Sequence, residues 1–334
     1  MSSFKFFFRV AFCFAKNRLF RVTLSLHSFA TLRNWLRQPL QSLPRFKIKK
    51  LEIEPICHLI KLRSCIMLNM ISFCCPLILC SLGALFSEFT GTLALFLDGM
   101  VNLSAFLFFL FFTLTKSFLL SFIITILTSI MLTMIFSFVI ETFKANKFIA
   151  SIGMNLLFSA LPSTFSSVIF KTRGILNSSD LQTLMSPLSS NIVSIIITSF
   201  FICCGILFLQ KTRYGLYIRI SAKDSDVLLS KGVNPSIPKI TGWSISSLYG
   251  SLAGILLILR ICSYVPNISS SRGWLGLAAV FVGKKKPLKI ILCVVIFCIA
   301  EIFATYIENF IPNIPTSLLI SFPYLVILCL VLFN

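Results

Sequence analysis

The sequence predicts an all-α fold, a polytopic membrane helical bundle of about eight spans plus one short helix that is either re-entrant or the end of a slanted span. Its mean hydropathy is +0.96. Apolar residues make up 57% of the 334 residues and charged residues only 12%, whereas charged residues form about a quarter of a soluble domain. The apolar residues gather in runs close to about 18 residues, the usual criterion for a membrane-spanning helix. These observations leave no room for a sizeable soluble domain.

Eight stretches meet or approach that length. In chain order they cover residues 66–86, 92–114, 117–140, 148–170, 191–209, 240–259, 289–307 and 316–333. A further apolar segment, 273–282, is too short to cross a bilayer alone. The lysines at 284–286 favour a cytoplasmic end for this segment, which implies that part of 263–272 also lies in the membrane.

Prolines and glycines fall inside or beside several predicted spans. Pro76 lies in the first span and Pro162 in the fourth, while Gly91 and Gly99 precede or interrupt the second. Helix breaks at membrane depth need neighbouring helices or a water-filled cavity to satisfy the freed backbone groups. The breaks therefore indicate a transport pathway. The serine-rich segment 175–190 predicts an external loop with little order.

The net charge of +20 does not indicate a nucleic-acid partner. Thirteen of the 30 basic residues precede Met67, and most of the others lie in short loops between spans. A nucleic-acid-binding protein would gather them on one soluble face with interleaved aromatic residues. Charge in this arrangement sets membrane topology and attracts anionic lipid.

Residues 1–65 form a separate basic region before the membrane domain at 66–334. One interpretation is a cytoplasmic arm that lies on the membrane surface. Another is a mis-annotated extension upstream of the true translation start, and the sequence favours neither. A signal peptide is disfavoured because no small-residue cleavage site follows an adequate apolar core.

Known catalytic and metal-binding patterns are absent from the sequence. It contains no G-x-x-x-x-G-K-[ST], G-x-S-x-G or H-E-x-x-H motif, and no histidine follows His58. Most of the 12 cysteines lie inside apolar spans, where a thiol acts as a small apolar group. Cys57, His58 and Cys65 lack a fourth ligand and fit no common zinc spacing. We therefore expect no enzyme, no metal site and no cofactor bound by this chain.

Three acidic residues lie close to or within the predicted spans. They are Glu88, Asp98 and Glu301. An ionisable group in the bilayer is costly unless it is paired or hydrated, so each is a functional hypothesis. The alternative for Glu88 is an interfacial turn, and the alternative for Asp98 is the cap of a helix start.

The longest polar stretch of the apolar body runs over residues 211–239 and holds six of the 30 basic residues. A basic loop of this size is expected to face the cytoplasm. Gly215 and Arg219 open a segment with helical character, and Gly232 closes it. This pattern predicts a short surface helix that a cytoplasmic partner could push.

Four blocks of this sequence resemble the permease subunits of ABC importers, in the ribose-type, branched-chain-like family that handles simple sugars and nucleosides. They read CPLILCSLGALFSEFTGTLALFLDGM, FKANKFIASIGMN, RYGLYIRISAKDSDVLLSKGV and SRGWLGLAAVFVGKKKP. The first is similar to that family's proline-containing first span with its Ser-Glu-x-x-Gly and Glu-Gly-Met elements. The second has asparagines at similar places, Asn146 and Asn155, and the third looks like the family's cytoplasmic coupling loop. Together the blocks cover roughly residues 75–287 in the family's order.

The resemblance implies a transmembrane permease subunit of an ATP-driven importer for nucleosides or simple sugars, multi-pass in the bacterial cytoplasmic (inner) membrane. The implied partners are an ABC ATPase that binds the ATP, a second permease subunit, a substrate-binding lipoprotein and membrane lipid. The Asp-Gly-Met element is more similar to the nucleoside branch. The implied sites are an ATPase-coupling loop with Gly215, Arg219, Lys223, Asp224, Asp226 and Gly232, and a substrate pathway with Glu88, Gly91, Asp98, Gly99 and Asn155.

Several positions depart from the family's pattern. Phe89, Ala94 and Phe96 replace an arginine, an asparagine and a glycine, and Ala222–Lys223–Asp224 replaces a Gly-Glu-Asn run, with Ser271 and Lys286 also differing. These losses of polar groups leave two other interpretations open. One is an ion-gradient-driven secondary transporter, which would be expected to show two repeated halves. The other is a non-transporting or decayed membrane subunit.

Overall fold

A computed structural model confirms the all-α membrane bundle. The structure describes residues 45–172, 174–184, 187–222, 225–310 and 316–332. Within these residues, seven helices are long and apolar enough to cross a membrane. The chain divides into two compact units, Met1–Arg63 and Ser64–Asn334. Residues 1–44 of the predicted N-terminal arm lie outside the described residues.

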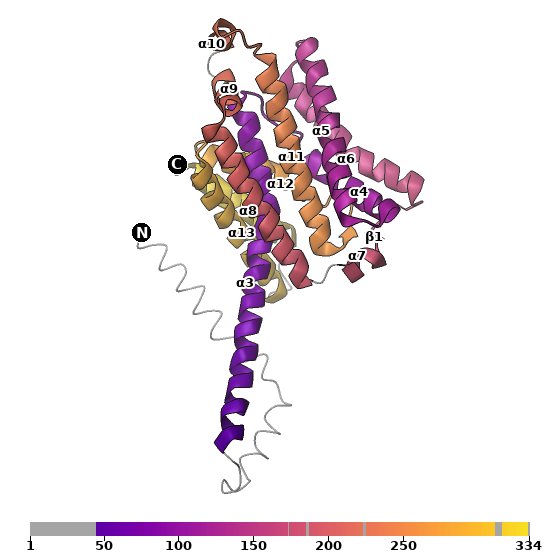
Figure 1. Cartoon of the computed structure of the whole chain (residues 1–334), viewed down its shortest axis with the longest axis vertical. Coiled ribbons are helices and arrows are strands. Elements are labelled where there is room, and N and C mark those ends of the chain that lie inside the picture. Colours follow the sequence, from indigo (N-terminus) through magenta and orange to yellow (C-terminus); the bar gives the residue numbers. More distant parts are fainter. Residues whose placement is uncertain (1–44, 173, 185–186, 223–224, 311–315, 333–334) are drawn as a thin grey trace. The chain divides into compact units, whose positions relative to one another are not determined.

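The helices and strands follow one another as shown in Figure 1. They are α3 (Arg45–Phe89), α4 (Leu97–Thr115), α5 (Phe118–Thr142), α6 (Lys147–Ile169), β1 (Leu176–Asn177), α7 (Ser179–Leu184), α8 (Pro187–Lys211), α9 (Arg213–Ser221), α10 (Ser225–Ser230), α11 (Ser236–Ile261), β2 (Ser263–Tyr264), α12 (Arg272–Val282), α13 (Pro287–Phe310) and α14 (Thr316–Leu332).

Each predicted span corresponds to one of these helices, and the short segment predicted apart from the spans is a helix as well. The last predicted span corresponds to α14, an apolar helix of 17 residues. The short segment predicted at 273–282 is α12, which has 11 residues. At a rise of about 1.5 Å per residue, α12 covers about half of the hydrocarbon layer.

Helices α3, α4 and α11 form the core of the bundle. In the most apolar 18-residue stretch of each of these helices, 78%, 72% and 72% of the residues are buried, against 28%, 22% and 22% in α5, α6 and α8. The outer faces of these last three helices carry exposed leucine, isoleucine and phenylalanine side chains. Such side chains suit a lipid-facing surface, because acyl tails are as apolar as the side chains themselves.

A row of small polar residues lets α5 approach the core closely. Ser121, Thr125, Ser129, Thr133 and Ser137 recur every fourth residue and are all buried. The Ser247 hydroxyl of α11 donates to the Ser129 carbonyl oxygen at 3.1 Å. Small residues with hydroxyl groups are typical of helix interfaces in membranes, because they allow backbones to come close and bond across.

Two sequence-based expectations about breaks and loops were wrong. The prolines do not break their helices: Pro76 lies inside α3 and Pro162 inside α6, both continuous. A membrane helix tolerates a proline because its neighbours satisfy the freed backbone groups. The breaks occur at 90–96, which contains Gly91 as expected, and at 262–271, whereas Gly99 lies inside α4.

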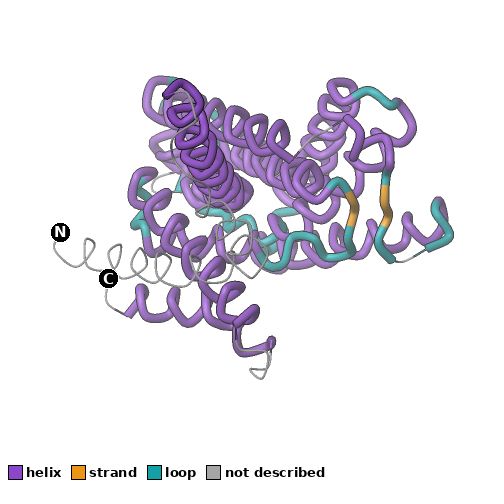
Figure 2. The backbone as a smooth tube through the Cα atoms, turned by 90° about the horizontal axis from the view of Figure 1, so that it is seen from below, coloured by secondary structure: helices purple, strands orange, loops and turns teal. Residues whose placement is uncertain are grey.

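The segment predicted as a disordered external loop contains regular structure. Its strand β1 pairs antiparallel with β2, with Leu176 opposite Tyr264, and Figure 2 shows the two strands side by side. Helix α7 follows β1, and its Leu181 is 1% exposed. Backbone pairing and one buried apolar anchor order a segment that composition alone marks as a loop.

Candidate functional site

The two ends of the bundle differ in charge. Helices α9 and α10 lie at one end, and α7 and β1 lie at the other (Figure 1). Basic residues in the connections and at the helix ends gather at the first end, namely Lys144, Lys147, Lys211, Arg213, Lys231, Lys284, Lys285 and Lys286, against Lys116, Lys171 and Arg260 at the second. Basic residues are retained on the cytoplasmic side. By this rule the end with α9 and α10 is the one expected to face the cytoplasm, and we call it the cytoplasmic end.

Two helices begin inside the bundle instead of at its ends. The start of α4 meets the middle of α6, and the start of α12 meets the start of α4. Their N-cap residues, Phe96 and Ser271, make no side-chain cap hydrogen bond. The first N–H groups of a helix have no partner within it, and water is scarce at this depth. Both helix starts therefore need acceptors from elsewhere.

Side chains of other helices supply these acceptors. The Asp98 carboxylate of α4 accepts a hydrogen bond from the Gly273 N–H of α12 at 3.1 Å. The Asn155 side-chain oxygen of α6 accepts one from the Gly99 N–H at 2.6 Å. The Ser151 hydroxyl accepts one from the Phe96 N–H at 3.2 Å. A negative charge near a helix N-terminus is also favoured by the helix dipole.

Glycine is required where these helices meet. A Cβ atom added at Gly99 would overlap the Asn155 carbonyl oxygen, and one added at Gly273 would overlap the Asp98 backbone. The side chains of Asp98 and Asn155 can therefore reach their N–H partners only because the two glycines let the backbones come close.

Asn102 adds two further hydrogen bonds, which the sequence analysis missed. Its side-chain oxygen accepts from the Ser269 N–H at 2.9 Å, and its amide nitrogen donates to the Asn267 side-chain oxygen at 3.3 Å. The available signal was its spacing of four residues from Asp98 within an apolar run, which places both on one helix face. We refer to Asp98, Gly99, Asn102, Asn155 and Gly273 as the mid-membrane junction.

The acidic residue predicted late in the chain lies beside α12. Glu301 of α13 pairs with Arg272, the first residue of α12, at 3.1 Å. The guanidinium carbons of Arg260 and Arg272 lie 4.5 Å and 5.6 Å from the centroid of the Phe73 ring. Arg272 is thus held by one carboxylate and one aromatic ring, which suits a charge at membrane depth.

The structure separates the five residues predicted for a substrate pathway into two groups. Asp98, Gly99 and Asn155 meet at the mid-membrane junction. Glu88 lies in the last turn of α3 and pairs with Lys285 at 2.8 Å. Gly91, in the turn after α3, lies so close to Ala222 that an added Cβ would be 3.2 Å from its Cα atom. Glu88 and Gly91 therefore belong to the cytoplasmic end.

The cytoplasmic loop contains two short helices, α9 and α10, so the prediction of one helix between Gly215 and Gly232 was wrong. The Thr212 hydroxyl oxygen accepts from the Gly215 N–H at 3.0 Å, so α9 begins before this glycine. Arg219 lies in the last turn of α9, where the helix dipole favours a positive charge. Gly232 follows α10 with a φ of 72°, as expected for a closing residue.

The remaining predicted loop residues fall at or beside α10. Asp226 is exposed in its first turn, whereas Lys223 and Asp224 lie outside the described residues. On the two helices, Ile218 and Leu228 are buried. The exposed apolar side chains are Tyr214, Leu216, Val227 and Leu229. Apolar side chains exposed next to charged ones are typical of a protein interaction surface.

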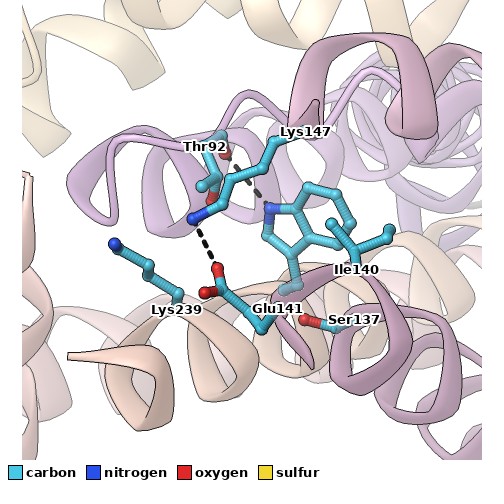
Figure 3. A pocket seen from close by; sticks show the side chains of 7 residues that line it. Thr92, Ser137, Ile140, Glu141, Lys147 and Lys239 are labelled. Carbon is cyan, nitrogen blue, oxygen red and sulfur yellow. Dashed lines mark hydrogen bonds and ion pairs between the residues drawn. The ribbon is translucent and has the colours of Figure 1, made fainter. Parts of the chain in front are cut away.

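A shallow pocket lies at the cytoplasmic ends of α5, α6 and α11 (Figure 3). Lys147 forms an ion pair with Glu141 across the turn between α5 and α6. The Trp243 ring N–H donates to the Thr92 carbonyl oxygen at 3.3 Å. The first contact joins α5 to α6, and the second joins α11 to the segment between α3 and α4. Among the described residues, no cluster of His, Cys, Asp or Glu could hold a metal ion.

Comparison with known proteins gives two kinds of match. The family described as "Branched-chain amino acid transport system / permease component" matches residues 66–332. The guanosine ABC transporter permease protein NupQ of Bacillus subtilis is 27% identical over 281 residues, which cover 76% of this chain and 86% of that protein. The nucleoside ABC transporter permease protein NupC of Lactococcus lactis subsp. cremoris is 26% identical over 283 residues, covering 78% and 88%. No solved structure matches.

Proposed function

The chain belongs to the branched-chain amino acid transport system permease family, and we propose that it is the nucleoside-translocating permease subunit of an ATP-driven ABC importer in a bacterial cytoplasmic membrane. The observation that carries the proposal is the mid-membrane junction. Helices that begin at membrane depth, with polar groups from several helices around their starts, are typical of substrate paths in transporters.

The similarity to relatives supports nucleosides as the substrate. Both relatives are named as permeases of a nucleoside or of guanosine. The Asp-Gly-Met element at 98–100 lies at the junction itself. Asp98, Gly99 and Asn155 would shape the path there, and the positive ends of α4 and α12 would favour the electron-rich groups of a polar solute.

The cytoplasmic loop supports a separate ATPase as the energy source. Its two helices expose apolar and charged side chains together, a composition that suits a polar protein interface. Gly215, Arg219, Asp226 and Gly232, with Lys223 and Asp224, would form the contact with the ATPase. A second permease subunit and a substrate-binding lipoprotein complete the proposed importer, and ATP would bind to the ATPase.

An ion-gradient-driven carrier has less support. Such a carrier needs a carboxylate at membrane depth that is free to change its charge. Of the three acids that lie close to or within the predicted spans, Asp98 accepts a hydrogen bond from Gly273, while Glu88 and Glu301 are held in ion pairs. Each of these carboxylates therefore already has a hydrogen-bond or ion-pair partner within the protein.

The test is uptake of radiolabelled guanosine into proteoliposomes that contain this chain, its co-purifying ATPase, second permease and lipoprotein. We expect uptake that requires ATP and the lipoprotein, and competition by other nucleosides but not by ribose. Uptake that persists without ATP and stops when the ion gradient is dissipated would replace the proposal with the secondary carrier. Purification of the chain without any ATPase in several mild detergents would argue for a non-transporting subunit.

A further inference from the structure

One set of contacts continues from the cytoplasmic loop to the mid-membrane junction through α12. It starts at Ala222, the C-cap residue of α9, which lies against Gly91. Three residues before Gly91, the Glu88 carboxylate pairs with the Lys285 ammonium at 2.8 Å. The end of α9 and the end of α12 therefore both contact the end of α3 and the turn that follows it.

Lys285 is firmly attached to α12. Its backbone N–H donates to the Val280 carbonyl oxygen at 3.2 Å, and the Lys284 N–H donates to the Phe281 carbonyl oxygen at 3.1 Å. These bonds continue the last turn of α12 into the lysine segment, as a helix C-terminal motif does. A displacement of the Lys285 side chain's partner would therefore act on the helix itself.

The other end of α12 holds the mid-membrane junction. Gly273, in its first turn, donates to Asp98, and Arg272 pairs with Glu301. Between the two ends, α12 lies against α3, where a Cβ added at Gly276 would be 3.0 Å from the Cys80 backbone. A single helix of 11 residues is stiff, so its ends move together.

The Glu88 contact differs from an ordinary surface pair. The Glu88 side chain is 14% exposed and the Lys285 side chain 47% exposed. A pair with one shielded partner is screened less by salt than a pair of fully exposed charges. It also lies three residues from Gly91, the residue that contacts Ala222 of the loop.

We propose that α12 connects the cytoplasmic loop to the mid-membrane junction, and that the Glu88–Lys285 ion pair is the positioning contact that makes α12 follow the loop. The proposal rests on the proposed importer function for its energy source. It makes Glu88 and Lys285 positioning residues for transport, with no contact to substrate required of either.

The experiment is a charge-reversal cycle in the complete importer. The variants are Glu88→Lys, Lys285→Glu and the double variant, with Lys286→Glu as a matched control one residue away. Guanosine uptake per ATP hydrolysed, ATP hydrolysis and complex assembly are measured together. We expect each single reversal to lower uptake per ATP by about fivefold, the low end of coupling between linked sites, with assembly and hydrolysis unchanged. The double variant should recover uptake, and Lys286→Glu should behave as the unaltered chain does.

A second readout does not depend on which solute is carried. Phe281, in the last turn of α12 next to the lysine segment, is 52% exposed, so a Phe281→Cys thiol can be labelled in the assembled complex and located by mass spectrometry. We expect ATP to change the labelling rate in the unaltered background and to leave it unchanged with Lys285→Glu.

The outcomes separate the two proposals. If the importer carries no nucleoside but shows the ATP-dependent change in labelling, the proposed substrate is wrong and the proposed role of α12 is supported. Normal uptake per ATP in both single reversals contradicts the role of the ion pair. A loss of assembly in proportion to the loss of uptake, or labelling that ATP does not affect in the unaltered chain, also overturns it.

Discussion

The mid-membrane junction and the cytoplasmic end of α12 use polar groups in opposite ways. At the junction, Asp98 and Asn155 are held by hydrogen bonds to helix N–H groups, and two glycines leave no space for a side chain. At the cytoplasmic end, Glu88 and Lys285 meet through an ion pair that is partly exposed. A polar group at membrane depth must keep its partner, whereas a pair near water can exchange one partner for another. The junction thus keeps its hydrogen bonds when α12 moves, and the polar contact that can change lies at the cytoplasmic end.

We expect the largest effect from a substitution that disrupts the mid-membrane junction by steric overlap. Gly273→Val places a branched side chain where the Asp98 backbone lies, so we expect a loss of stability of about 3 kcal/mol. Thermal unfolding in detergent, followed by size-exclusion chromatography, measures it. Gly153→Val is the matched control, because an added Cβ at Gly153 meets nothing within 4 Å. Equal unfolding temperatures for the two variants would contradict the close contact.

The next largest effect is expected from removal of the Asp98 carboxylate, which accepts a hydrogen bond at the start of α12. Asp98→Ala leaves the Gly273 N–H without its acceptor, which should cost about 2 kcal/mol. Asp98→Asn keeps an acceptor oxygen and should cost less. The same unfolding measurement compares them. If Asn were as damaging as Ala, the charge of Asp98 and not its hydrogen bond would be the essential property.

A smaller effect is expected at the start of α4. Asn155→Leu keeps the size of the side chain and removes the acceptor of the Gly99 N–H, for a loss of about 1 kcal/mol, as for other helix caps. Asn155→Asp retains an acceptor and serves as the control. Unfolding of both variants at the same temperature would show that the bond to Gly99 contributes little.

The smallest effect on stability is expected from a substitution in the cytoplasmic loop. It tests whether polar residues on that side act in coupling and contribute little to stability, in contrast to those of the mid-membrane junction. Arg219→Glu reverses a charge in the last turn of α9, and we expect a loss of about 0.5 kcal/mol, because the helix dipole disfavours a negative charge there. Substrate-stimulated ATP hydrolysis and guanosine uptake should nevertheless fall. Unchanged uptake and hydrolysis would remove Arg219 from the coupling contact.

Local sequence patterns predicted most of the fold. Apolar runs located the helices, because a segment in lipid must satisfy its backbone groups within itself and therefore forms a helix wherever it is apolar enough. The polar stretch at 211–239 located the segment that holds α9 and α10, and its basic residues predict that this segment faces the cytoplasm. The three acids, Glu88, Asp98 and Glu301, were recognised because charge is rare in these spans.

The partners of those acids could not be predicted in the same way. Asp98 caps a helix whose first N–H groups lie 175 residues further along the chain, and Glu88 pairs with a lysine that composition marks only as topology-setting. Proline content wrongly placed the helix breaks, and Asn102 was missed inside an apolar run. Hydropathy and propensity are sums over neighbours in the chain, so they determine which segments cross the membrane. Which helix starts at membrane depth, and which side chain satisfies it, depends on contacts between distant segments that form only when the helices pack.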